Sequence, residues 1–183
     1  MNWVILVLLA IVISTAIVAS SIFPMLYSRE ARAFFEDSYA IKKSLEEGEV
    51  LLSFRVYVQE LNVPLSIVNQ EGSLNLEAST VKIVFEVPSA PHVDNRSELF
   101  NVWGNKTHAG VSTWIKVVDN GFKITIVYVD AVDIGETFRI KVLEDVDVLK
   151  FYMENGRIFF NNTLIYSFSG YREIEVKKLE LKF

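Results

Sequence analysis

The residues of this chain best suited to metal binding are His92, Asp94 and His108, which include both of its histidines. All three fall within the segment Pro88–Gly110. Imidazole and carboxylate groups are the usual nitrogen and oxygen ligands of zinc, so these side chains could in principle meet at a metal ion. Their spacing is irregular, however, and favours ordinary surface residues. We therefore expect no bound metal and no cofactor.

Carboxylates gather at two further places in the sequence and raise the question of calcium binding. One is the run Glu144-Asp145-Val146-Asp147, and the other is the set Asp130, Asp133 and Glu136. Neither has the Asp-x-Asp-x-Asp-Gly spacing of a calcium-binding loop. Both patterns are more typical of solvated turns.

Motifs for catalysis are missing from the sequence. It contains no Gly-x-Ser-x-Gly turn for a serine nucleophile, no glycine-rich phosphate loop and no cysteine. A pair of carboxylates for glycoside hydrolysis stays open, because such a pair forms in space and leaves no spacing in the sequence. The sequence favours a protein that is not an enzyme.

The composition limits the partners of the chain. Its 183 residues carry a net charge of −5, and no cluster of lysine and arginine is present to bind phosphates, which argues against nucleic acid. The absence of cysteine excludes disulfides and mildly favours a prokaryotic source. Few glutamines, with many Val, Ile, Glu and Lys, are typical of thermophiles.

The segment Trp3–Tyr27 has no charged side chain, and the first charge after it is Arg29. At about 1.5 Å per residue, a helix of this length crosses a hydrocarbon core of about 30 Å. We therefore predict a single transmembrane helix over residues 1–27. The alternative is a secretory signal cleaved near Ala19-Ser20-Ser21, but the segment is too long for one and no basic residue precedes it.

The side of the membrane that carries the rest of the chain is indicated by two opposing features. Arg29 and Arg32 alone would place it in the cytoplasm. Three Asn-x-Ser/Thr sequons, in segments that we expect to be loops, favour the outside and are possible glycosylation sites: Asn95, Asn105 and Asn161. We expect a single-pass protein of the cell membrane with its C-terminal domain outside the cytoplasm.

Residues 28–48 are predicted to extend the helix beyond the membrane. Gly48 is a plausible end, and Pro24 is expected to kink the helix within the span. This extension has an apolar stripe that could pack against a partner helix or against the domain that it carries: Ala31, Phe34, Ser38, Ile41 and Leu45.

Small residues recur four apart within the span, a spacing that lets membrane helices approach closely. The pairs are Ala10 with Ser14, Thr15 with Ala19, and Ala16 with Ser20. Small residues are also common in membrane helices that pack against nothing. The pattern is therefore compatible both with close helix packing and with an ordinary membrane span.

Residues 49–183 are predicted to form one β domain. Nine or ten short alternating segments, with no second amphipathic helix, favour an antiparallel, immunoglobulin-like β-sandwich. Three segments are expected to be turns: Asp119-Asn120-Gly121, Asn155-Gly156 and Asn161-Asn162. A change of phase predicts a bulge or short turn near Ser79-Thr80, and Pro88–Gly110 is expected to be a long excursion at one end of the domain.

An uncharged N-terminal helix that extends past the membrane and carries a strand-rich domain resembles the archaeal type IV pilin-like superfamily, including the archaellum accessory proteins. The resemblance rests on Trp3–Tyr27, Pro24, residues 28–47 and the β domain, and it covers architecture only. The sequence departs from the filament pilins: it lacks a basic leader ending in glycine, and no acidic residue precedes Glu30. Either the chain is numbered from its mature end or it is never processed, and an unprocessed Met1 resembles the accessory proteins more than the filament pilins.

This resemblance implies a non-enzymatic structural protein that assembles with a surface filament or with the S-layer, as a homo- or hetero-oligomer. An alternative function is a membrane-tethered binding module that holds an S-layer protein, a glycan or another surface partner, chiefly through Pro88–Gly110. A tethered enzyme is the least supported of the three functions.

Overall fold

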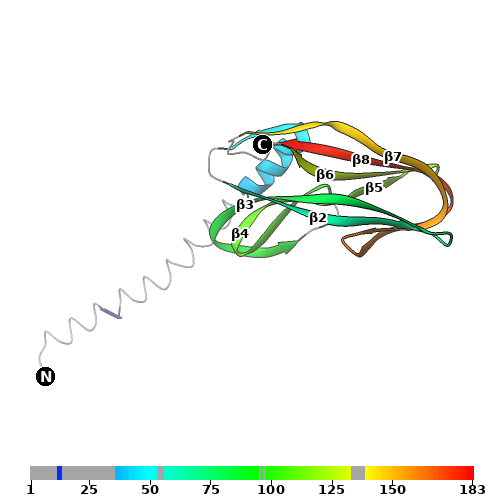
Figure 1. The fold of residues 1–183 in the computed structure, drawn as a ribbon. Coiled ribbons are helices and arrows are strands. Elements are labelled where there is room, and N and C mark those ends of the chain that lie inside the picture. The colour runs from blue at the N-terminus through cyan, green and yellow to red at the C-terminus, as the bar shows by residue number, and fades with distance from the viewer. Residues whose placement is uncertain (1–11, 14–35, 53–55, 95, 97, 133–138) are drawn as a thin grey trace, which may run out of the picture.

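A computed structural model describes residues 12–13, 36–52, 56–94, 96, 98–132 and 139–183 of the chain (Figure 1). The described part is mainly β, as predicted, with one short helix at residues 36–47. No helix within it has the length and apolar character needed to span a membrane. The predicted span Trp3–Tyr27 lies outside the described residues except for Val12 and Ile13, which are helical and exposed.

Within its described residues, the domain contains one sheet of eight strands. Their bounds are β1 Glu49–Leu51, β2 Tyr57–Val68, β3 Ser73–Asp94, β4 Phe100–Thr113, β5 Lys116–Asp119, β6 Lys123–Val132, β7 Arg139–Phe160 and β8 Thr163–Lys182. The strand order is β4-β3-β2-β7-β8-β6-β5, and β1 pairs with β7 outside this path. Every pair is antiparallel except β6 with β8, which run parallel.

The sheet curls so that strands distant in its order face each other (Figure 1). β3 and β6 are not neighbours in the sheet, yet the Ser79 hydroxyl on β3 donates to the Asp130 carboxylate on β6 at 2.6 Å. Buried apolar residues fill the space enclosed by the curl in two clusters. One contains Val81, Ile83 and Phe85 near the helix, and the other surrounds Phe160.

The described residues form fewer strands than the nine or ten predicted, in part because β7 runs through a point that the sequence marks as a break. Asn155-Gly156 was expected to be a hairpin turn, and this prediction is wrong. Asn155 adopts a φ of 50° inside β7, and its side-chain oxygen accepts the Gly170 amide of β8 at 2.7 Å. A side chain at Gly156 would lie 2.7 Å from the Phe168 ring, so this Asn-Gly pair forms a bulge that makes room for a neighbouring ring.

The other two predicted turns are present. Asn161 and Asn162 connect β7 to β8 with φ values of 49° and 59°, as a two-residue turn requires. Between β5 and β6, the Asp119 carboxylate accepts the Gly121 amide at 2.7 Å, and Gly121 has a φ of 88°. The Asn120 side chain accepts the Lys123 amide at 2.8 Å, which closes the turn from within.

The segment Pro88–Gly110 is not the long irregular excursion that was predicted. β3 continues to Asp94 and β4 begins at Phe100, so most of the segment is a hairpin. The bulge or short turn expected near Ser79-Thr80 is also absent, since β2 and β3 pair there without a shift. The register between β3 and β4 shifts farther along, between Glu86 and Val93, which changes the face of the sheet that later residues occupy.

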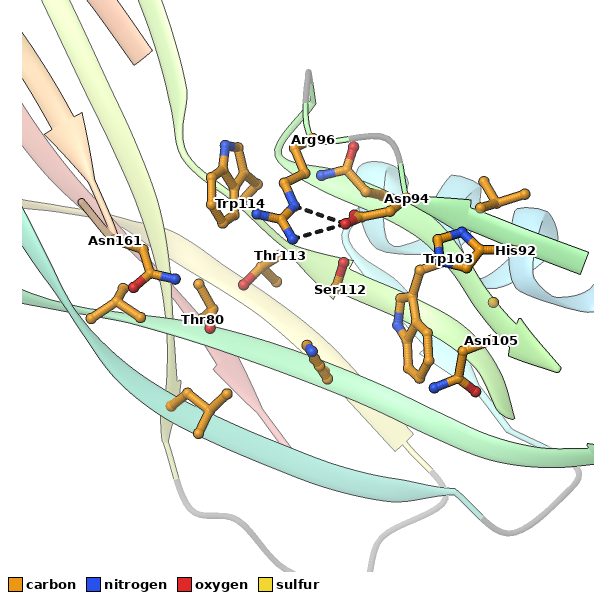
Figure 2. A pocket seen from close by; sticks show the side chains of 16 residues that line it. Thr80, His92, Asp94, Arg96, Trp103, Asn105, Ser112, Thr113, Trp114 and Asn161 are labelled. Atoms are coloured by element: carbon orange, nitrogen blue, oxygen red, sulfur yellow. Dashed lines mark hydrogen bonds and ion pairs between the residues drawn. The ribbon is translucent and has the colours of Figure 1, made fainter. Parts of the chain in front are cut away.

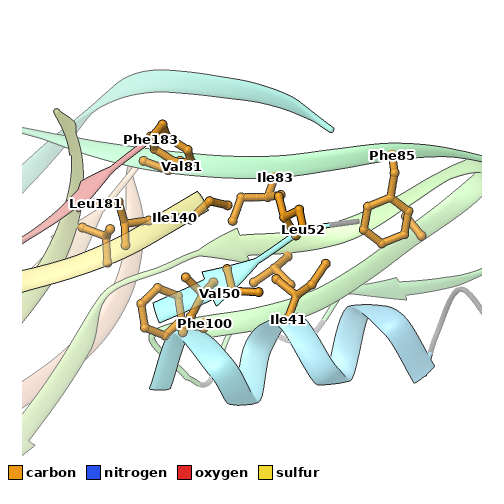
Figure 3. Close-up of a cluster of buried hydrophobic side chains, with 14 of the residues drawn as sticks. Ile41, Val50, Leu52, Val81, Ile83, Phe85, Phe100, Ile140, Leu181 and Phe183 are labelled. Atoms are coloured by element: carbon orange, nitrogen blue, oxygen red, sulfur yellow. The ribbon is translucent and has the colours of Figure 1, made fainter. Parts of the chain in front are cut away.

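The helix at residues 36–47 packs against the domain that it precedes (Figure 3). Its buried side chains, Ser38, Ile41 and Leu45, belong to the predicted stripe. Ile41 and Leu45 join the core cluster of Val81, and Gly48 follows the helix with a φ of 111°. Of the two readings of the stripe, packing against the domain is therefore the one observed for these residues.

Several sequence predictions concern residues outside the described part of the chain. They are the stripe residues Ala31 and Phe34, the kink at Pro24, and the close-packing residues Ala10, Ser14, Thr15, Ala16, Ala19 and Ser20.

Candidate ligand-binding cleft

The hairpin of β3 and β4 forms one wall of a cleft of about 230 Å³ (Figure 2). Half of the lining residues, eight of sixteen, come from Pro88–Gly110. Others come from β2, from the middle of β3, from the end of β4 and from the β7–β8 turn. The lining residues used below are Thr80, Lys82, His92, Asp94, Arg96, Asn101, Trp103, Asn105, Ser112, Thr113, Trp114 and Asn161.

Strand geometry explains why these side chains share one cleft. Alternate residues of a strand lie on the same face of a sheet, as His92 and Asp94 do on β3 and Trp103 and Asn105 do on β4. Asp94 is paired with Trp103 across the two strands. The paired ends of β3 and β4 therefore place a histidine, a carboxylate, an indole and an amide around one opening.

Arg96 connects the carboxylate to the second indole of the cleft. Its Nε and a terminal nitrogen both donate to Asp94 Oδ2, at 2.9 and 2.8 Å, which leaves Oδ1 as a further acceptor. The guanidinium carbon lies 4.9 Å from the centre of the Trp114 ring, within cation–π range. Figure 2 shows the guanidinium between Trp114 and Asp94.

Lys82 and Trp103 form the second cation–indole pair. The Lys82 ammonium lies 5.6 Å from the ring centre of Trp103 and has no carboxylate partner among the described residues. The indole Nε1 of Trp103 is buried and has no hydrogen-bond partner within the described structure. Because a buried donor without a partner costs free energy, a ligand acceptor that displaced the atoms covering this nitrogen would bind favourably there.

The floor of the cleft is fixed by buried contacts. The Thr113 hydroxyl accepts the Val81 amide at 2.8 Å, and the Asn101 side-chain amide donates to the Glu98 carbonyl at 2.5 Å. Trp114, which is only 8% exposed, packs edge-on against Phe160 with ring centres 4.9 Å apart. These contacts hold the lining residues in place before any ligand arrives.

The residues considered for metal binding are only partly brought together. His92 and Asp94 both line the cleft, whereas His108 is outside the lining and its Nδ1 lies 2.9 Å from the Thr107 hydroxyl. Within the described residues, no three His, Asp or Glu side chains are grouped to hold a metal ion.

The sequons have different positions in the fold. Asn105 lies within β4, which corrects its predicted place in a loop, and its side-chain oxygen accepts the His108 amide at 3.1 Å. Asn161 lies in the β7–β8 turn, and both residues line the cleft. Asn95 lies outside the described residues. A glycan on Asn105 or Asn161 would therefore lie at the cleft itself.

The described residues of the two acidic clusters lie in strands and not in the solvated turns that we expected. Asp130 lies in β6 and is half-buried, while Asp133 and Glu136 lie outside the described residues. Burial opposes the ionisation of Asp130, but hydrogen bonds with Ser79, Glu60 and Lys178 lower its pKa overall. Burial and the hydrogen bond with Asp130 raise the pKa of Glu60. The run that begins at Glu144 lies within β7.

The two cation–indole pairs of the cleft were not singled out from the sequence: Arg96 with Trp114, and Lys82 with Trp103. A signal for two of these residues was present, since Arg96 and Trp103 fall in the segment that was expected to hold a ligand. Lys82 and Trp114 lie outside it, and only the pairing of β3 with β4 and the position of Trp114 beside Phe160 bring them to the cleft.

Comparisons with protein-family models, with curated proteins and with solved structures found no match for this chain.

Proposed function

We propose that this chain is a membrane-anchored, extracytoplasmic binding module that holds a cell-surface partner in the cleft of its β domain. The observation that carries the proposal is a pair of donors in the cleft that have no acceptor among the described residues: the Lys82 ammonium, which has no carboxylate beside it, and the buried Trp103 Nε1. A preformed cleft with a few convergent polar groups is the usual form of a binding site.

The arrangement supports binding better than catalysis. Asp94 is the only carboxylate among the described residues that line the cleft, and Arg96 already holds it in an ion pair at 2.8 Å. Hydrolysis of a glycoside by the usual mechanism needs two carboxylates on either side of the bond, and the described lining offers one.

The sequence supports the proposed anchor and location. The uncharged segment Trp3–Tyr27 supports a single span, and the sequons at Asn105 and Asn161 support an outside position for the domain. We also propose that the curled sheet is an immunoglobulin-like sandwich. The facing of β3 and β6 supports this assignment, while the parallel β6–β8 pair is unusual for it.

The absence of cysteine makes the membrane orientation directly measurable. Ser169 is exposed on β8, so the variant Ser169→Cys provides a single thiol on the domain. We expect a membrane-impermeant maleimide to label this variant on intact cells. The control Asn2→Cys places the thiol before the predicted span and should be labelled only after lysis.

Two other results of this labelling experiment would count against the outside location or against the anchor. Labelling of Ser169→Cys only after lysis would contradict the outside location. Release of the labelled domain from membranes by carbonate, together with loss of the Asn2→Cys thiol from the mature chain, would support the cleaved-signal alternative over the anchor.

Assembly with a surface filament or an S-layer is a second candidate function. It is favoured by the sheet edges, because within the described residues β4 and β5 each pair with a strand on one side only. Such an edge can accept a strand from another subunit. The small residues of the predicted span, such as Ser14 and Ala16, would bring the helices of the assembly together.

This second function predicts an oligomer that depends on close helix packing. The double variant Ser14→Leu and Ala16→Leu keeps the span apolar but obstructs close approach, so we expect its mass in detergent to fall to that of a monomer. Light scattering after size exclusion measures this. The control Val7→Leu and Val12→Leu should keep the oligomer, and an unchanged mass in the first variant would contradict helix-driven assembly.

A further inference from the structure

We propose that the cleft binds a saccharide that carries a carboxylate, as one acidic ring of a longer surface polysaccharide. This inference rests on the proposed function, which places the domain where such polymers occur. It adds the chemical class of the ligand, and it is argued from the charges, the donors and the size of the cleft.

The charges of the cleft favour an anion. Lys82 and Arg96 are the cations of the described lining, and Asp94 is its only carboxylate. The cleft therefore has a formal charge of +1 in a chain whose net charge is −5. Arg96 is neutralised by Asp94 at 2.8 Å, so the surplus charge belongs to Lys82.

The indole nitrogen of Trp103 lies on the same side of the cleft as the Lys82 charge. The Lys82 ammonium is 5.6 Å from the centre of the Trp103 ring, and the indole nitrogen of that ring is buried with no partner in the part of the chain that the structure describes. In Figure 2 this nitrogen lies on the edge of the ring that faces the middle of the cleft. A carboxylate has two acceptor oxygens, so one could accept from Lys82 and, once the atoms covering the indole nitrogen move aside, the other could accept from Trp103.

The remaining lining residues suit a sugar ring. Hydroxyl and amide side chains both donate and accept hydrogen bonds, as sugar hydroxyls do, and the cleft presents Thr80, Ser112 and Asn161. The indole rings add apolar surface for the C–H groups of a pyranose. Simple anions such as phosphate would leave these groups and this surface unused.

The size of the cleft limits how much of a ligand it encloses. At about 230 Å³ it is smaller than the sites of about 300–1,000 Å³ that enclose drug-sized ligands. It has room for about one sugar ring, and the rest of a polysaccharide would continue outside. Repeated acidic rings on one polymer could then engage several anchored copies of the domain.

The test is calorimetry on the full chain in detergent, produced in a host without N-glycosylation so that Asn105 and Asn161 are unmodified. The probes are tetragalacturonate and a hyaluronan tetrasaccharide. Their methyl esters serve as neutral counterparts, and tetraglutamate serves as an acidic peptide. We expect at least one acidic tetrasaccharide to bind with a Kd below about 1 mM, and its methyl ester to bind at least tenfold more weakly.

Variants connect this binding to the cleft. Lys82→Gln removes the surplus charge, and Trp103→Phe keeps an aromatic ring but removes the donor, so each should weaken binding at least fivefold. The control Arg157→Gln removes an exposed cation of β7 that does not line the cleft, and it should bind as the wild type does. Thermal unfolding of each variant shows whether it is folded.

Three results would overturn the inference: no acidic tetrasaccharide binds below about 1 mM, the methyl esters bind equally well, or tetraglutamate binds as tightly as the sugars. Equal binding by folded Lys82→Gln and by the wild type would also overturn it. None of these results affects the maleimide labelling of Ser169→Cys, so the inference can fail while the proposed location and anchor remain supported.

Discussion

Replacing Gly110 with alanine is expected to destabilise the β domain by about 3 kcal/mol or more and to disorder the cleft. An added Cβ would lie 1.9 Å from the Ile83 carbonyl oxygen on β3. That oxygen belongs to the backbone of the paired strand, so the clash cannot be relieved by turning a side chain. β3 and β4 would have to separate near Ser112 in the lining.

The requirement at Gly110 is one of space and not of backbone conformation, because Gly110 is not among the glycines with positive φ. Gly72 provides a matched control: it also lacks a positive φ, and an added Cβ there would have no atom within 4 Å. Gly72→Ala should therefore change stability by no more than about 0.5 kcal/mol.

Thermal unfolding measures the difference between these two variants. For a domain of this size, a loss of about 3 kcal/mol lowers the Tm by about 6–12 °C. Equal Tm values for Gly110→Ala and Gly72→Ala would mean that β3 and β4 are not packed as described, and the wall of the cleft would then be in doubt.

Replacing Glu175 with glutamine is the second change with a large expected effect. Glu175 lies on β8, is 4% exposed, and joins Lys123 of β6 at 2.5 Å to Lys150 of β7 at 2.7 Å. Breaking a buried ion pair costs about 3–5 kcal/mol, and less where the remaining charges can reach water, as both lysines can. We expect Glu175→Gln to lower the free energy of unfolding by about 2 kcal/mol at pH 7.

The loss should depend on pH in a defined direction. Hydrogen bonds from Lys123 and Lys150 lower the pKa of Glu175 from 4.5 to about 2. A carboxylate with a lowered pKa stabilises the fold above its unfolded pKa, and this contribution disappears as the pH falls toward the folded value. The difference between wild type and Glu175→Gln should therefore shrink between pH 4.5 and pH 2, as urea unfolding at several pH values would show.

Glu60→Gln serves as a contrast with the opposite sign. Burial and the neighbouring Asp130 raise the pKa of Glu60, so ionised Glu60 costs the folded state stability at neutral pH. The free energy of unfolding of Glu60→Gln minus that of the wild type should therefore be larger at pH 7 than at pH 4. A Glu175→Gln deficit that stays constant across pH would contradict the ion-pair interpretation.

The sequence predicts the turns well where local chemistry alone forms them. Asp119-Asn120-Gly121 closes through its own side-chain hydrogen bonds, so its residue types suffice. Asn155-Gly156 has an equally strong pattern, but the packing of the Phe168 ring on Gly156 makes it a bulge inside β7. Tertiary packing of this kind leaves no trace in the local sequence, which is why the strands were predicted too short and too many.

The cleft was predictable only as a segment. The sequence pointed to Pro88–Gly110 as the region that would hold a ligand, and half of the lining comes from it. The meeting of Lys82 with Trp103 depends on the pairing of β3 with β4 and on the register shifts along it. Alternation along a single strand gives no information about such pairing.

The most direct test of the account is an NMR titration of the full chain with the acidic tetrasaccharide that binds it best. Its three tryptophans give three indole N–H signals, from Trp3, Trp103 and Trp114. We predict that the Trp103 signal moves strongly as its unpartnered Nε1 gains an acceptor, that the Trp114 signal moves less, and that the Trp3 signal stays in place. Saturable binding that leaves the Trp103 signal unmoved would contradict the assignment of the cleft as the binding site.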